Sequence, residues 1–129
     1  MVNNNLRLAG EWFKKAKADI DFAKIGIKET QHYGQVCFLC QQAAEKYLKG
    51  FLVANGIKPP RIHSVTTLAN RCIKITQKFT DLIPKCKILD RYYIPTRYPI
   101  AIGLTFKKED AQEALCILSK IIKVVERYC

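Results

Sequence analysis

Long hydrophobic runs are missing from this chain of 129 residues. Lysines interrupt its apolar stretches every few positions, so none reaches the roughly 20 residues that a membrane-spanning helix needs. The first ten residues also lack the apolar region of a secretory signal peptide. From these two absences we expect a cytoplasmic protein without a membrane anchor. Because 49% of the residues are apolar, the chain is too hydrophobic to be disordered, and its length predicts one domain over residues 1–129.

Paired metal ligands are missing as well. Of the six cysteines, Cys37 and Cys40 lie three apart in an apolar run and the other four are scattered. A structural zinc site would need a second Cys or His pair at ligand spacing, so we expect no metal and no cofactor. The cysteines are expected to be reduced core residues, with disulfides as the alternative if the chain comes from a hyperthermophile.

Acidic residues are scarce. Eleven Asp and Glu stand against 22 Lys and Arg, which gives a net charge of +11. An excess of this size indicates a polyanionic partner, such as nucleic acid, a nucleotide or an acidic protein. The alternative is a lysine-rich surface that keeps the chain soluble by self-repulsion.

What the chain does contain is helical periodicity, since no segment alternates apolar and polar residues in the manner of a strand. Apolar residues recur at four-three spacing and predict helices near residues 5–30, 35–54 and 108–128, with a turn at 32–34. A third helix is expected after the cap Ser64, and a short one from Thr80 to about Tyr93-Ile94; Thr105 should cap the last helix and Asn55-Gly56 end the second. The predicted fold is all-α, an up-and-down antiparallel bundle of four long helices plus one short helix.

Three polar clusters stand where core packing does not require them. On the second helix, Gln42, Glu45 and Lys49 share one face, which could be a simple Glu45–Lys49 pair or a polar groove offering Lys46 and Lys49 to phosphate. At the start of the third helix, residues 61–64 combine Arg61, His63 and the cap Ser64. This helix N-terminus could seat a phosphate, or His63 could be purely structural.

The third cluster lies in residues 91–99, where two arginines and three tyrosines are braced by two prolines. Arginine gives bidentate phosphate contacts, and tyrosine gives a face on which a base can stack. The alternative is a structural loop whose arginines pair with Asp90 or Glu45. The residues expected to contact a ligand across the three clusters are Lys46, Lys49, His63, Arg91, Tyr93, Arg97 and Tyr98.

The order QQAAEKYLK at residues 41–49, His63-Ser64, and YYIPTRYP at residues 92–99 resembles the HEPN domain family. The resemblance extends from about Glu11 to Tyr128 and implies an up-and-down helical bundle that is often a homodimer. It also implies action with a minimal nucleotidyltransferase, as a toxin–antitoxin pair or a similar two-part system. Some family members are proposed to bind nucleotides, and a large subset are metal-independent ribonucleases.

That ribonuclease subset carries an arginine followed, after a short spacer, by a histidine. The two histidines here are His32 and His63, and residues 25–27 and 56–58, where the arginine would stand, contain none. Arg61 is too close to His63 to fill that role. The sequence therefore favours a binding module that is not an enzyme and that holds a nucleotide or RNA beside a nucleotidyltransferase.

Two alternatives stay open. One is a ribonuclease with a rearranged site, in which His63 is the base and Arg97 stabilises the developing charge. The other is a purely structural protein that docks an acidic nucleotidyltransferase through its basic face.

Overall fold

The structure is a computed structural model that describes residues 4–93 and 105–129. In these two ranges the chain forms helices and no strands. In chain order the elements are α1 (Asn4–Glu29), α2 (Tyr33–Ala54), α3 (Val65–Ile73), the 3-10 helix η1 (Gln77–Leu82), α4 (Ile83–Asp90) and α6 (Lys108–Tyr128). The predicted all-α fold is confirmed.

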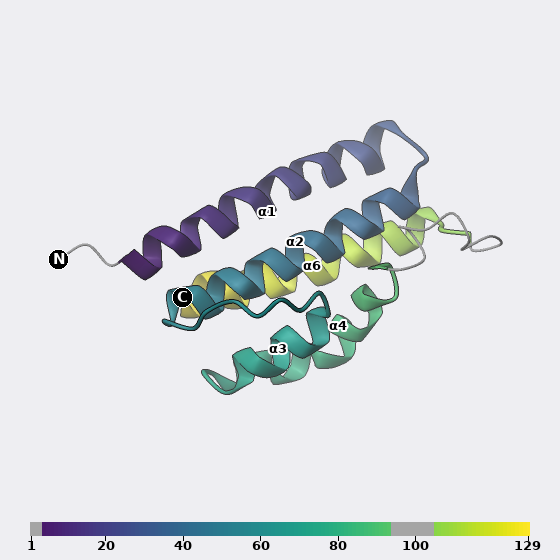
Figure 1. Ribbon diagram of the computed structural model, residues 1–129. Coiled ribbons are helices and arrows are strands. Elements are labelled where there is room, and N and C mark those ends of the chain that lie inside the picture. The colour runs from purple at the N-terminus through teal and green to yellow at the C-terminus, as the bar shows by residue number, and fades with distance from the viewer. Residues whose placement is uncertain (1–3, 94–104) are drawn as a thin grey trace.

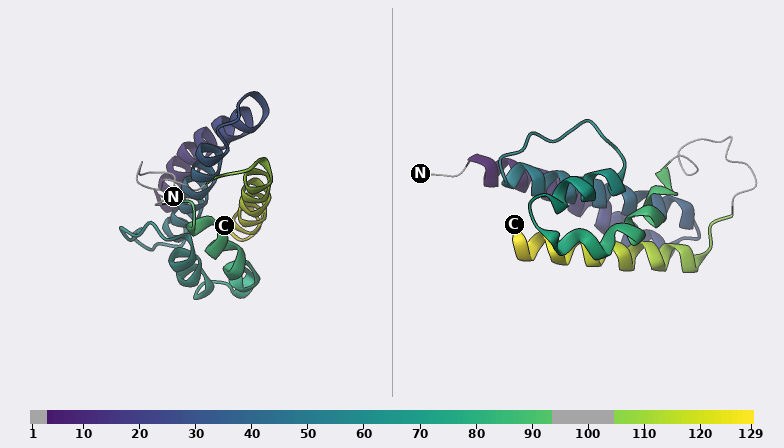
Figure 2. Two further views of the ribbon diagram at one scale, coloured as in Figure 1. Left: turned by 90° about the vertical axis from the view of Figure 1, so that its right-hand side faces the viewer. Right: turned by 90° about the horizontal axis from the view of Figure 1, so that it is seen from below.

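The helices α1 and α2 run antiparallel, α3 runs in the same direction as α2, and the chain reverses at α4 and again at α6 (Figures 1 and 2). After α2, the connection over residues 55–64 crosses the front of the molecule and runs back to about the middle of α2, where α3 begins (Figure 1). The helices α1, α2 and α6 are long, with 26, 22 and 21 residues, whereas α3 and α4 have nine and eight. The up-and-down antiparallel bundle predicted from the sequence is present, with three long helices where four were expected.

The helix α2 lies at the centre and contacts α1, α3, α4 and α6. It can do so because it is apolar around much of its circumference, with buried side chains facing several directions. Leu48, Phe51 and Leu52 are fully buried. The ring of Phe51 meets Phe79 of η1 edge to face, with 5.0 Å between the ring centroids.

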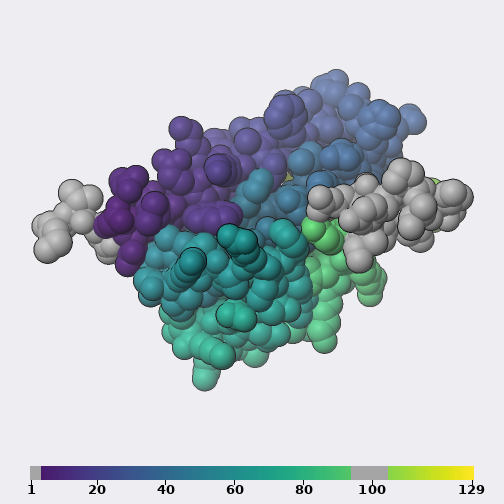
Figure 3. Space-filling view, viewed as in Figure 1, coloured from purple at the N-terminus to yellow at the C-terminus, as the bar shows by residue number. Residues whose placement is uncertain are grey.

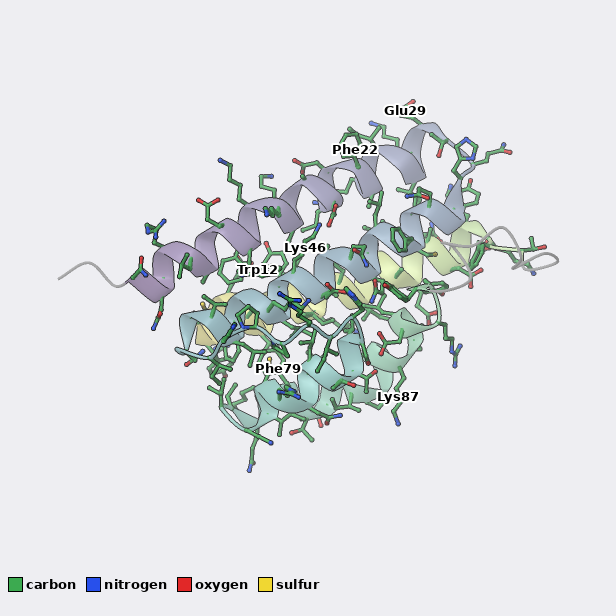
Figure 4. The ribbon with its side chains drawn as sticks, in the orientation of Figure 1. Trp12, Phe22, Glu29, Lys46, Phe79 and Lys87 are labelled. Carbon is green, nitrogen blue, oxygen red and sulfur yellow. The ribbon has the colours of Figure 1, made fainter. Side chains whose placement is uncertain are left out.

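The helix α1 packs almost entirely against α2. Its fully buried side chains are small and recur every seven residues, at Ala9, Ala16 and Ala23. Small side chains let two helix backbones approach closely, and Gly50 of α2 provides the same closeness beneath the ring of Phe13. The far side of α1 stays exposed and includes Phe22 (Figure 4).

Several helix ends differ from the sequence-based expectation. Tyr33 and Gly34 belong to α2 and not to a turn; a side chain at Gly34 would meet the ring of Phe106, so this glycine serves packing. The predicted cap Thr105 is wrong, because α6 begins after Lys107, whose N–H donates to the Asp110 carboxylate at 2.8 Å. The short helix expected from Thr80 is η1 followed by α4 and ends at Asp90.

Two predicted ends are confirmed. Ser64 caps α3 by accepting the Thr67 N–H at 3.1 Å. Gly56, just after α2, takes the left-handed backbone conformation with φ of 78°, which glycine adopts without steric cost.

All six cysteines are free thiols, which fits the expectation of reduced residues. Four of them are buried, and burial raises the pKa of each to about 12; they are Cys37, Cys40, Cys72 and Cys86. Cys116 and Cys129 are exposed and are not core residues. Over the described ranges, no helix is long and apolar enough to cross a membrane.

Candidate functional site

Glu45, near the middle of α2, is a buried carboxylate that contacts one lysine and one histidine. Its Oε2 atom accepts from the Lys49 ammonium at 3.1 Å, and its Oε1 atom lies 3.2 Å from Nδ1 of His63. Glu45 and Lys49 are only 5% and 6% exposed, whereas the His63 side chain is 58% exposed. A chain of polar contacts therefore leads from the interior of the bundle to its surface.

The backbone at His63 is fixed from α2. The fully buried Gln41 donates from Nε2 to the carbonyl oxygen of His63 at 2.8 Å. Gln42 in turn donates to Oε1 of Gln41 at 2.7 Å. These contacts hold the connection after α2 against the helix itself, so His63 reaches Glu45 although the two lie 18 residues apart.

Asp90, at the end of α4, occupies the N-terminus of α3. Its carboxylate accepts the N–H groups of Val65 and Thr66 at 2.7 and 3.0 Å, and the Ser64 hydroxyl donates to it at 3.0 Å. A carboxylate at this end also complements the helix dipole. The sequence-based hypothesis of a phosphate seat at this N-terminus is therefore wrong, because an internal anion already fills it.

Tyr93 covers the imidazole of His63. The two rings are stacked, with centroids 5.4 Å apart and planes 13° from parallel. Phe38 of α2 lies on Tyr93 as well, with 6.4 Å between centroids. We call Glu45, Lys49, His63 and Tyr93 the Glu45 cluster.

This arrangement has a definite chemical character. The Glu45 carboxylate orients the imidazole by contacting Nδ1, and Tyr93 covers one face of the ring, while the side chain as a whole is still 58% exposed. Such a histidine can donate or accept a hydrogen bond, or move a proton, at Nε2. Over residues 4–93 and 105–129, no group of three His, Cys, Asp or Glu side chains gathers that could hold a metal ion.

The structure places the predicted ligand residues as follows. Lys49, His63 and Tyr93 come together in the Glu45 cluster. Lys46 is instead paired with Asp19 of α1 at 2.6 Å, in a contact that ties the two helices together (Figure 4). Arg91 is exposed at the end of α4. Arg97 and Tyr98 lie outside the described residues.

Sequence reasoning missed two residues that contact the Glu45 cluster. Gln41 belongs to the QQAAEKYLK motif, but nothing local indicates that its amide donates to a backbone carbonyl 22 residues away. Trp12 falls within the first predicted helix, and nothing near it in the sequence indicates that its ring lies 5.7 Å from the Lys49 ammonium. The one signal that could have pointed to Trp12 is that it is the single tryptophan of the chain.

Comparison with known proteins agrees with this fold. The HEPN domain profile matches residues 9–128, nearly the full length of the chain. The chain belongs to the HEPN domain family. A protein named "Putative toxin MJ1304", from Methanocaldococcus jannaschii, is similar to this HEPN domain at 30% identity over 96% of this chain and 90% of its own length.

Two solved structures share the fold. TT1696 from Thermus thermophilus is 32% identical, covers 94% of this HEPN domain with 98% of its own chain, and superposes with a TM-score of 0.81. ST0689, described as an archaeal HEPN homologue, is 30% identical, covers 92% with 95% of its chain, and has a TM-score of 0.74.

Proposed function

We propose that this HEPN domain is a binding module that holds a nucleotide or a segment of RNA and acts with a minimal nucleotidyltransferase in a two-part, toxin–antitoxin-like system. It would work in the cytoplasm, as one domain over residues 1–129 and as a homodimer. The similarity to a protein named as a toxin supports the two-part system. The proposed nucleotidyltransferase partner follows from the family resemblance.

The Glu45 cluster carries the ligand half of this proposal. Burying an ion pair costs desolvation energy, and apolar residues of similar size would serve stability as well or better. The pair is therefore better explained by what it supports, an oriented imidazole stacked on a tyrosine at the surface. Stacked rings beside cationic groups suit a base with its phosphate. The net charge of +11 favours the same class of ligand.

Calorimetry tests ligand binding directly. ATP, GTP, UTP and a short RNA are titrated into the protein at low salt, and we expect binding that weakens as salt is added. His63→Ala should lower the affinity about tenfold, because losing one stacked ring costs roughly 1–3 kcal/mol. His32→Ala is the matched control, since His32 is exposed on the turn between α1 and α2 and has no contact with the Glu45 cluster. The absence of heat with all four ligands would remove the ligand half of the proposal.

Co-expression tests the partner. Co-purification of the HEPN domain with a nucleotidyltransferase encoded beside it is the expected result. A stable complex combined with no heat from any nucleotide or RNA would instead favour a structural docking protein.

A second function, RNA cleavage, has one observation in its favour. Contact of Nδ1 with a carboxylate leaves Nε2 of His63 to act as a general base. Arg97, the other residue of that hypothesis, lies outside the described residues. Cleavage of RNA by the wild type that disappears in both His63→Ala and Arg97→Gln would establish this activity, and intact RNA with the wild type would exclude it.

A further inference from the structure

An apolar pocket opens beside the Glu45 cluster, between the first turns of α1 and the chain that leaves α2. Its volume is about 500 Å³, within the size range of small-molecule sites. On the face shown in Figure 3, these purple turns of α1 lie against the teal connection. The apolar side chains that line the pocket are Leu8, Trp12, Val53, Ile57 and Pro59. We call it the Trp12 pocket.

The pocket walls combine exposed apolar side chains with a tryptophan that contacts a buried lysine. Leu8 and Ile57, on opposite walls, are among the few large apolar side chains that stay exposed. Trp12 lies between α1 and α2 (Figure 4), and the Lys49 ammonium lies 5.7 Å from its ring centroid. Because Lys49 also binds Glu45, one buried lysine links the Trp12 pocket to His63.

The charges at the pocket fit an anion joined to an apolar ring. Lys15 and Lys58 line it and are exposed, one on each wall. The carboxylate of Glu11 also lines it, which leaves the lining with one net positive charge. Glu11 can accept a hydrogen bond from a ribose hydroxyl or an exocyclic amine, and the two lysines can contact a phosphate.

We propose that the Trp12 pocket binds the base of a nucleotide, with the phosphate held by Lys15 and Lys58. The inference rests on the proposed nucleotide binding and adds a second site for a base, which Lys49 separates from the His63–Tyr93 stack. The flat indole and the aliphatic walls would cover the base, and the flanking lysines would select a phosphorylated nucleoside over a neutral one. The same base and phosphate could belong to a free nucleotide or to one unit of an RNA strand.

Fluorescence gives a direct test, because Trp12 is the only tryptophan of the chain. ATP, adenosine and a short oligoadenylate are titrated into the full-length protein, and Trp12 emission and its quenching by acrylamide are recorded. We expect ATP to change the emission and protect the indole from acrylamide, with adenosine at least about fivefold weaker. Equal or tighter binding of the oligoadenylate with the same response would assign the site to an RNA unit.

Charge variants locate the phosphate. Lys15→Gln with Lys58→Gln should weaken ATP binding about tenfold, since each exposed charge close to a phosphate contributes a few-fold in affinity. The matched control is Lys14→Gln with Lys28→Gln, which removes the same charge from exposed positions of α1 that do not line the pocket. Trp12→Leu should also weaken binding by calorimetry, and the lysine variants keep the test independent of any effect of that change on folding.

The outcomes separate this inference from the proposed function. ATP that binds by calorimetry, leaves Trp12 emission unchanged and responds to His63→Ala but not to the Lys15–Lys58 pair would overturn the Trp12 pocket and leave the proposed function in place. No calorimetric binding of any nucleotide or RNA would overturn both. Equal losses in the two lysine pairs would also overturn the inference, because the effect would then be one of net charge alone.

Discussion

The buried pair of Glu45 and Lys49 allows a quantitative test of how the site is held. Glu45→Gln keeps the shape of the side chain but removes its charge, and so leaves the Lys49 ammonium without an opposite charge. At 3.1 Å the attraction is about 5 kcal/mol at an effective dielectric constant of about 20, and desolvation of the two groups offsets much of it. We expect Glu45→Gln to lower the free energy of unfolding by about 3–5 kcal/mol.

The companion variants separate the pair from its parts. Lys49→Met should be similarly costly, whereas the double variant should lose less than the sum of the two by about 2 kcal/mol or more, because it leaves no unpaired charge. Lys17 and Asp21 of α1 are the control. They have the same four-residue separation, at 3.4 Å, but their side chains are 71% and 56% exposed, so Asp21→Asn should cost only a few tenths of a kcal/mol.

Urea unfolding followed by circular dichroism measures all four variants under one two-state treatment. A loss below about 1 kcal/mol for Glu45→Gln would refute the reasoning. So would a double variant whose loss equals the sum of the single losses, since the two charges would then not act as a pair.

Two further predictions concern packing and thiols. Gly50→Ala should lower the free energy of unfolding by about 1–3 kcal/mol, because a Cβ atom there would come within 2.9 Å of Cδ1 of Phe13. Gly10→Ala, where a Cβ atom would meet nothing within 4 Å, should raise it by up to about 1 kcal/mol. Thermal unfolding measures both variants, and equal effects would contradict the close packing of α1 on α2. Burial raises the pKa of four thiols from 9.0 to about 12, so between these two pH values the thiols ionise in the unfolded chain only. The free energy of unfolding is therefore constant below about pH 9 and falls as the pH rises above it, by about 1.4 kcal/mol per pH unit for each thiol. Urea unfolding at pH 8 and 10 should show a smaller fall in the free energy of unfolding for a variant with Cys37→Ala and Cys40→Ala than for the wild type. Equal falls would contradict the raised pKa of these two thiols.

Much of the fold follows from local pattern. The seam of α1, the apolar circumference of α2 and the cap Ser64 each depend on residues within one or two turns, so the sequence alone predicts them. Gly34 could not be placed in the same way. Glycine after a helix usually marks a turn, and only contact with Phe106, far along the chain, explains why it lies inside α2.

In the candidate site, too, local pattern predicts some contacts and not others. Glu45 and Lys49 were predicted as a pair because four residues on one helix bring two side chains together. The partners of Lys46 and of the α3 amides could not be foreseen, since Asp19 and Asp90 come from other helices. The sequence offers Asp90 as a partner for the arginines of residues 91–99, but in the folded chain its oxygens accept from Ser64, Val65 and Thr66.

The capping of α3 by Asp90 has an entropic consequence. Gln41 holds the backbone carbonyl of His63, and Asp90 holds the amides just beyond Ser64, so the chain is fixed at His63 and directly after it before any ligand arrives. Fixing one residue's backbone costs roughly 1–2 kcal/mol, and here that cost belongs to folding. A ligand that reaches His63 therefore meets a preorganised ring and loses little affinity to ordering it.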